Sequence, residues 1–243
     1  GSLHSFPLPD DLKRYAFYVP DVFSPKANCF PENLYHFQDF NLTMSRSSAR
    51  NIDGKIPLNK AFNFIRKSLG YGITPRSIYS LSTQLISECF DKDKKNRRRI
   101  FQSVISFDIF YKLLKQTKPD FVSFFTNHVA SAMHRYWAAK FPTHYKEQPF
   151  SSTWIDSFHN EIDFAMHQAD YMLGKLINFI SLNPQYKLWI TTSMGQEAVL
   201  SKEVETQVYI EDLNKFMSML GLDKSNWNAC PAMLPQYNFF IEK

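Results

Sequence analysis

Glycine is scarce in this sequence, with 7 glycines among 243 residues. A phosphate-binding loop built on closely spaced glycines is therefore not expected. Cysteine is scarce as well: Cys29, Cys89 and Cys230 are odd in number and far apart. They predict free thiols in a reducing compartment rather than a disulfide framework. No CxxC pair or mixed cysteine–histidine spacing typical of zinc sites is present.

Long apolar runs are missing too. No stretch of about 18 apolar residues is available to span a membrane, and no signal-peptide pattern opens the chain. Together with the free thiols, these absences predict a cytoplasmic protein without a membrane span. Gly1-Ser2 is typical of a cloning remnant, and the chain ends directly after its last expected strand. We therefore expect a piece of a longer chain with other domains.

Aromatic residues are abundant, with 23 Phe and 12 Tyr, and predict a large core. The net charge is +5, and much of the excess lies in one basic run. Such a run is typical of a surface for nucleic acid or, more often, of a solvated loop between helices. Asp91 and Asp93 interrupt it and no aromatics interleave, which favours the loop and makes a nucleic-acid partner unlikely. The run consists of Lys92, Lys94, Lys95, Arg97, Arg98 and Arg99.

Three segments are expected along the chain. Residues 1–56 contain five prolines, which rule out long helices there and predict a loop-rich N-terminal segment. Residues 57–118 have helical apolar spacing and predict a helical subdomain or cap. Residues 119–243 alternate between helix and strand patterns and predict an α/β core.

The helices of the second segment are expected at residues 58–69, 75–90 and 95–117. Thr74 precedes Pro75 at the start of the middle helix. Threonine is a favoured N-cap residue, and proline is favoured at the first helical position. This pair therefore predicts where the middle helix begins.

In the third segment, the short apolar runs 121–126 and 186–192 predict buried parallel strands. A long amphipathic helix is expected between them, over residues 152–182, and Asn183-Pro184 ends it. This alternation favours an open parallel sheet. Further elements are expected as a strand at 204–210, a helix at 211–220 and a last strand at 236–241.

Both runs continue into distinctive sequences. The first leads into Asn127-His128-Val129-Ala130-Ser131-Ala132-Met133-His134-Arg135-Tyr136-Trp137, and the second into Ser193-Met194-Gly195-Gln196-Glu197. These segments resemble the strand ends of the alkaline phosphatase superfamily, in its phosphodiesterase-like and sulfatase-like branches. There, one strand leads into Asp-x-x-x-His followed by Arg-aromatic-Trp, and a later strand ends in Ser-Asp-His-Gly. The resemblance covers about residues 119–200. It implies an alkaline-phosphatase-like parallel sheet flanked by helices, with a helical insertion before residue 119.

The resemblance also implies a two-metal phosphoryl site whose ligands are mostly replaced. Ala130 and Ser193-Met194 stand where the family has Asp and Asp-His, and His134 alone matches. Methionine and serine do not replace hard, charged ligands. We therefore expect no bound metal and no other cofactor. What the resemblance leaves is a pseudoenzyme with an anion-accommodating cleft for a phosphorylated or sulfated small molecule or glycan. The candidate binding residues are Asn127, His128, His134, Arg135 and Gln196.

Several alternatives stay open at this stage. Ser193 is a candidate nucleophile for a metal-independent phosphodiesterase-, phosphatase- or sulfatase-like hydrolase. Arg135 suits either a bidentate anion contact or a surface ion pair. The spacing of His159, Asp163 and His167 on one helix face suits a metal or, more often, a solvated surface. A third function class is a protein-interaction domain that uses the helical segment.

Overall fold

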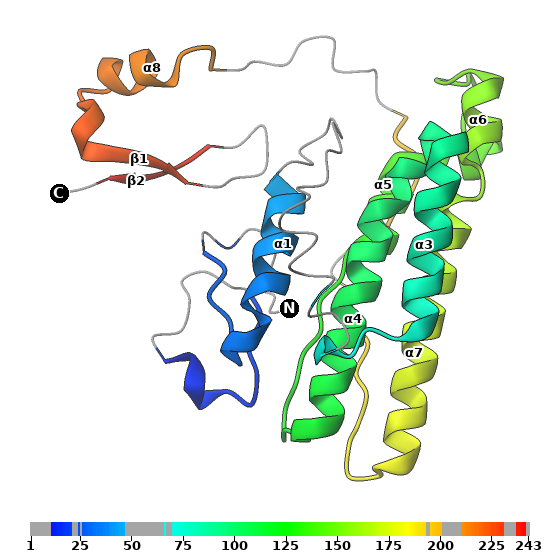
Figure 1. The fold of residues 1–243 in the computed structure, drawn as a ribbon. Helices are drawn as coiled ribbons and strands as arrows, with labels where there is room; N and C mark the ends of the chain where they lie inside the picture. Colours follow the sequence, from blue (N-terminus) through cyan, green and yellow to red (C-terminus); the bar gives the residue numbers. More distant parts are fainter. Residues whose placement is uncertain are drawn as a thin grey trace. The chain divides into compact units, whose positions relative to one another are not determined.

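The computed structural model describes residues 11–20, 24, 26–46, 66, 70–192, 195–200, 210–230 and 237–241. The chain divides into two compact units. One unit is Ser68–Ser201, and the other combines Gly1–Lys67 with Lys202–Lys243. The described residues of the chain as a whole are mostly helical, and those of the Ser68–Ser201 unit form long helices (Figure 1).

The Ser68–Ser201 unit is a bundle of helices that lie side by side (Figure 1). Helix α5 packs against α4, α6 and α7, and α3 packs against α4 and against the 3-10 helix η3. Another 3-10 turn, η4, follows α5. The elements are α3 (Pro75–Phe90), η3 (Lys92–Arg97), α4 (Arg98–Thr117), α5 (His128–Lys140), η4 (Pro142–His144), α6 (Ser152–Phe158) and α7 (Glu161–Leu182).

The core of this bundle has two parts. The first joins α4, α5, α6 and α7 through Ile100, Ala132, Tyr136, Ala139, Phe158, Ile162 and Ala165. The second is aromatic: the ring of Phe124 lies 4.9 Å from that of Phe110 and 5.5 Å from that of Phe107. The ring of Phe179 contacts Tyr186 at 5.3 Å. The abundant aromatic residues thus fill the spaces between helices.

The start of α3 confirms the prediction from Thr74-Pro75. The side chain of Thr74 accepts a hydrogen bond from the backbone N–H of Ser77, and Pro75 occupies the first turn. The backbone N–H of Thr74 donates to the buried carboxylate of Asp108 at 2.9 Å, which ties this helix start to α4. The helix expected at 95–117 is also confirmed as α4, which begins a few residues later. The helix expected at 58–69 lies outside the described residues, apart from Arg66.

The basic run is not a solvated loop, and that prediction is wrong. Its residues form η3 and the first turn of α4. Arg97 donates to both carboxylate oxygens of Glu161 on α7, at 2.6–3.0 Å. Arg98 does the same with Glu88 on α3, at 2.6–3.1 Å. Both carboxylates are buried, so these pairs join three helices at one end of the bundle.

The long helix expected at 152–182 is interrupted. Helix α6 ends at Phe158, and α7 begins at Glu161. Asn183 follows the end of α7, as Asn183-Pro184 predicted. Because the interruption falls at 159–160, His159 does not continue the helical face of Asp163 and His167. Its Nδ1 lies 2.8 Å from the backbone oxygen of Asp156, and Asp163 pairs with Lys140.

The other unit contains short elements. The N-terminal part holds the 3-10 turns η1 (Leu12–Arg14) and η2 (Glu32–Leu34) and helix α1 (Tyr35–Arg46). A 12-residue helix contradicts the expectation of no long helix within residues 1–56. The buried side chain of Gln38 on α1 donates to the backbone oxygen of Pro20 at 3.0 Å. Cys29 is a free, buried thiol, and burial, followed by the charge of Glu32, raises its pKa to about 11.

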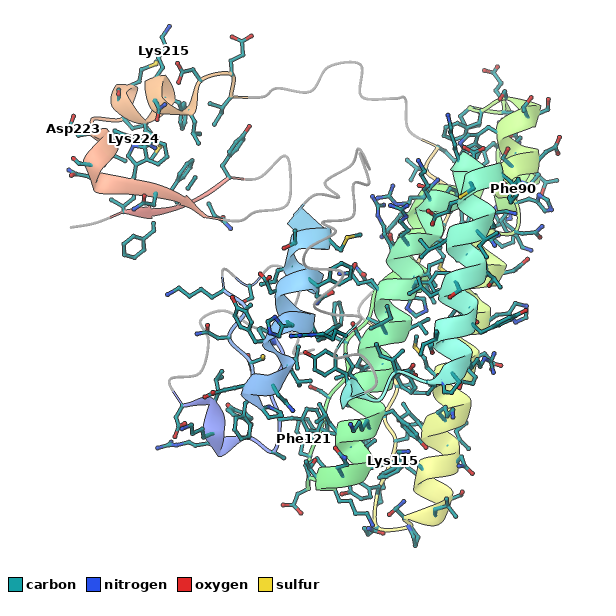
Figure 2. The ribbon with its side chains drawn as sticks, viewed as in Figure 1. Phe90, Lys115, Phe121, Lys215, Asp223 and Lys224 are labelled. Atoms are coloured by element: carbon teal, nitrogen blue, oxygen red, sulfur yellow. The ribbon has the colours of Figure 1, made fainter. Side chains whose placement is uncertain are left out.

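The C-terminal part of that unit has helix α8 (Leu213–Met219), the 3-10 turn η5 (Lys224–Asn226) and strands β1 (Trp227–Cys230) and β2 (Asn238–Ile241). Helix α8 and strand β2 confirm the elements expected at 211–220 and 236–241. The strands pair antiparallel, with Trp227 opposite Ile241. Lys224, labelled in Figure 2, lies 3.7 Å from the centre of the Trp227 ring. The strand expected at 204–210 lies outside the described residues, apart from Ile210.

The prediction of an α/β fold, an alkaline-phosphatase-like parallel sheet flanked by helices with a helical insertion, is wrong. The sheet in the described part of the chain is the two-stranded antiparallel pair of β1 and β2. Residues 121–126 and 186–192 form no strand. Phe124 reaches the core, but Phe121 and Trp189 are almost fully exposed (Phe121 is labelled in Figure 2).

The physical reason lies in what a strand requires beyond its own residues. A short apolar run has the same pattern in a buried strand and in an extended segment that covers helices. A parallel strand also needs neighbouring strands for its backbone hydrogen bonds. Here the two segments meet through a side chain instead: the hydroxyl of Tyr186 donates to the backbone oxygen of Pro119 at 2.8 Å.

None of the described helices is both long and apolar enough to cross a membrane. This agrees with the expectation of no membrane span. The expected cytoplasmic location stays a prediction.

We predict that Glu161→Ala lowers the free energy of unfolding of the helical unit by about 3 kcal/mol, because it leaves the guanidinium of Arg97 without its buried carboxylate. Chemical denaturation followed by circular dichroism measures this change. Lys94→Gln is the matched control, since the exposed pair of Lys94 and Asp91 is worth at most about 0.5 kcal/mol.

The double variant Arg97→Met/Glu161→Leu tests whether the lost stability comes from the unpaired buried charge or from the loss of the ion pair itself. It removes both charges and should recover most of the lost stability. Equal losses in Glu161→Ala and in the double variant would contradict the assignment of the cost to an unpaired buried charge.

Candidate functional site

The predicted binding residues are not gathered at one sheet edge, because the parallel sheet that would have aligned them is absent. Asn127 lies at the N-cap position of α5, but its side chain makes no capping hydrogen bond. The amide Nε2 of Gln196 donates to the neighbouring backbone oxygen of Glu197 at 2.9 Å. Ser193, the candidate nucleophile, lies outside the described residues, as does Met194.

His128 is the first residue of α5 and is buried. Its Nδ1 lies 2.7 Å from the hydroxyl of Thr126, which in turn donates to Ser103 at 3.1 Å. Its Nε2 is buried with no hydrogen-bond partner. Burial lowers the pKa of His128, and the nearby backbone of Ala165 opposes that change without completing a hydrogen bond at Nε2. This geometry suits a neutral imidazole inside the bundle rather than a contact to a solvated ligand.

His134 and Arg135 are both exposed. Six positions of α-helix place His134 about 120° from His128 around α5. Because one ring is buried and the other is exposed, the two histidines do not face the same ligand. Arg135 is different, because helical spacing places it between Ala132 and Ala139, two residues of the core shared with α4. Its long side chain leaves that side of the helix for solvent.

The charge of Arg135 acts on a second arginine. Arg99, in the first turn of α4, precedes Ile100, which packs into the same core as Ala132 and Tyr136. Burial lowers the pKa of Arg99, and the positive charge of Arg135 lowers it further. No carboxylate in the described part of the chain forms an ion pair with Arg135. We define Arg99 and Arg135 as the arginine pair.

Tyr136 lies beside the arginine pair. Burial is the main factor that raises the pKa of Tyr136 to about 12, and the charge of Glu161 adds to it. The guanidinium groups of Arg135 and Arg99 oppose that rise. The phenol therefore stays protonated at neutral pH and offers an O–H near two positive charges.

No group of three or more His, Cys, Asp and Glu side chains suited to a metal occurs among the described residues. The arginine pair offers hydrogen-bond donors rather than metal ligands, because its two guanidinium groups supply only N–H groups and positive charge. Chemically, this arrangement suits an oxyanion.

Sequence reasoning included Arg135 among the candidates but missed Arg99. The available signal was the start of α4, where three consecutive arginines occupy the end of the helix that disfavours positive charge and no acidic residue stands in the first turn. Arg97 and Arg98 pair with the buried carboxylates of Glu161 on α7 and Glu88 on α3. Arg99 is the one on which the charge of Arg135 acts.

Comparisons with protein-family models, with curated proteins and with solved structures find no match to this chain.

We predict that the free energy of unfolding falls as the pH drops below about 6.5, because His128 is held neutral in the folded state and takes up a proton more readily when unfolded. A folded-state pKa below the unfolded value means that stability is lost toward acid. Denaturant titrations between pH 5 and pH 8 measure the slope.

His128→Asn should flatten this slope while retaining a polar group near the position of Nδ1. His134→Asn is the control, since its exposed ring changes surroundings little on folding. An unchanged slope in His128→Asn would show that another group causes the acid sensitivity.

Proposed function

We propose that the helical unit binds an anion non-catalytically, and that the arginine pair holds a phosphate or sulfate group of the ligand. The observation that carries this proposal is that the packing of α5 against α4 brings Arg135 within electrostatic reach of Arg99: burial lowers the pKa of Arg99, and the positive charge of Arg135 lowers it further. Like charges repel each other, and an anion between them would give two attractive contacts.

The position of the arginine pair supports an anion rather than a neutral ligand. The N-terminus of a helix carries partial positive charge, which adds to the field of the two side chains.

Guanidinium chemistry supports the choice of ligand class. The planar fork of arginine matches the oxygen geometry of phosphate and sulfate, and it forms paired hydrogen bonds to them. The motifs at 127–137 and 193–197 that resemble those of the alkaline phosphatase superfamily favour the same ligand class, although the parallel sheet of that superfamily is absent from the described part of the chain. A phosphorylated or sulfated small molecule or glycan is thus the proposed ligand.

The sequence supports binding rather than metal-assisted hydrolysis. Ala130 and Ser193-Met194 stand where that superfamily has its Asp and Asp-His ligands. Neither alanine nor the Ser-Met pair supplies the hard oxygen and imidazole donors that clamp a phosphoryl group through two cations.

The test is isothermal titration of the full chain with inorganic phosphate and with sodium sulfate, at constant low ionic strength. We predict saturable binding that Arg135→Gln weakens at least about tenfold, because one of two charged donors is lost. Lys146→Gln is the matched control, since it removes one positive charge from an exposed side chain of the same unit. Equal binding by both variants would contradict the proposed site.

Thermal unfolding provides a second readout. At a phosphate concentration ten times the dissociation constant, binding adds about 1.4 kcal/mol to the free energy of unfolding. Phosphate and sulfate also stabilise proteins by exclusion from their surfaces. The informative quantity is therefore the difference between the unmodified chain and Arg135→Gln in the same buffer.

Assays with phosphomonoester, phosphodiester and sulfate ester substrates, with and without added Zn²⁺ or Mn²⁺, test the non-catalytic part. No turnover is expected. If the unmodified chain hydrolyses a substrate and Ser193→Ala does not, the function is hydrolysis and the proposal of non-catalytic binding is wrong.

A further inference from the structure

Helix α3 buries its polar side and exposes its apolar side. Its buried residues are Ser77, Gln84 and Glu88, which share one face of the helix. The opposite face carries the exposed side chains of Ile78, Tyr79, Leu85, Ile86 and Phe90. An amphipathic helix at a protein surface normally has the reverse orientation.

The buried polar face is well satisfied. The amide of Gln84 donates to Glu88 at 3.0 Å and to the backbone oxygen of Lys94 at 2.6 Å. Glu88 also accepts two hydrogen bonds from Arg98. Ser77 lies 2.9 Å from the hydroxyl of Thr74. These hydrogen bonds fix the helix with its polar side inward. Its apolar side therefore faces outward.

We define the α3 face as the exposed side of this helix. Besides its five large apolar side chains it includes the small exposed residues Ser82 and Cys89. Phe90 projects at the end of the helix (Figure 2). Arg76 at the edge of the face is the one charged residue there, and its guanidinium stacks on the ring of Tyr171 at 3.8 Å. A strongly charged partner would thus find no complementary charge on this face.

The area of the α3 face matches what a stable interface requires. Phe90 is 87% exposed, Tyr79 71% and Ile86 61%. With Ile78 and Leu85, the exposed apolar surface comes to about 500 Å². A standard interface buries about 800 Å² on each partner, of which about 60% is apolar. An exposed apolar patch of this size is comparable to the largest patch on a typical monomer, and such a patch is often functional.

We propose that the α3 face binds the α3 face of a second copy of this chain, with the two helices antiparallel and the two-fold axis near Ser82. The residues on either side of Ser82 support this register. In such a pair, Ile78 of one copy lies opposite Ile86 of the other, and Tyr79 lies opposite Leu85. The small side chain at the centre lets the helices approach, and large apolar side chains flank it on both sides.

The low charge of the α3 face favours a second copy. Two identical, strongly charged faces would repel each other, whereas each of these faces carries one charged residue, Arg76, at its edge. Each copy carries a net charge of +5, so the remaining repulsion is between whole chains and is screened by salt. Dimerisation should therefore strengthen with salt, whereas anion binding at the arginine pair should weaken.

Sedimentation equilibrium of the full chain over a range of concentrations tests the dimer. We expect a reversible monomer–dimer equilibrium, and Ile86→Glu should weaken it at least about 100-fold, because each dimer would bury two unpaired carboxylates. Ile177→Glu is the matched control: Ile177 is also an exposed isoleucine, at 56%, but lies on α7. It should leave the equilibrium unchanged.

Two further variants test the antiparallel register. The variant Ile78→Lys by itself should also fail to form a homodimer. A mixture of Ile78→Lys and Ile86→Glu chains should form a heterodimer, because residue 78 of one copy faces residue 86 of the other. In a parallel pair each residue would face its own counterpart, and the mixture would gain no such contact.

Disulfide formation gives an independent measure of the same register. Ser82→Cys in a Cys89→Ser background should form a covalent dimer under mild oxidation, because facing Cα atoms of closely packed helices lie about 4–5 Å apart. Cys89→Ser alone is the control. The unmodified Cys89 residues should not link, since antiparallel helices place them about 21 Å apart along the axis.

The outcomes are decisive in both directions. A chain that stays monomeric at all concentrations would overturn the proposal. This holds whether another segment of the same chain covers the α3 face or the face stays exposed. A dimer that Ile86→Glu leaves intact would assign the interface to a different face. Rapid linkage of unmodified Cys89 would replace the antiparallel pair with a parallel one.

Discussion

The two arginine–carboxylate pairs at the start of α4 are the interactions on which the arrangement of the helices depends. Arg97 reaches Glu161 on α7, and Arg98 reaches Glu88 on α3. Each pair is bidentate and buried, so each fixes direction as well as distance. Buried ion pairs add little net stability over apolar packing, but losing one partner is costly. Their main effect is therefore to exclude other arrangements of α3 and α7 around α4.

The helices were largely predictable, because their signals are local. Thr74-Pro75 marks the start of α3, Asn183 marks the end of α7, and a 3.6-residue apolar period runs between such limits. The strands were not predictable in this way. A short apolar run such as 121–126 indicates only that some of its side chains are buried. In the structure, Phe124 packs against helices while Phe121 faces solvent.

The candidate site shows the same division between local and distant information. Arg135 was accessible to sequence reasoning through the motif that contains it. Its relation to Arg99 was not, because 36 positions separate them and only the packing of α5 against α4 brings them together. The orientation of α3 was equally hidden. Its pattern predicts an amphipathic helix, but whether the apolar side faces inward depends on the partners of Gln84 and Glu88.

The charges at the start of α4 link the fold to the proposed function. Arginines at a helix N-terminus oppose the helix dipole, at a cost of about 0.3–1 kcal/mol each when exposed. Glu161 and Glu88 offset that cost for Arg97 and Arg98 by direct pairing. At Arg99 the nearby charge from α5 is another arginine, which adds to the unfavourable field. The same turn therefore contains two arginines that join helices and a third, Arg99, on which the like charge of Arg135 acts. An anion held by the arginine pair would offset the repulsion between Arg99 and Arg135.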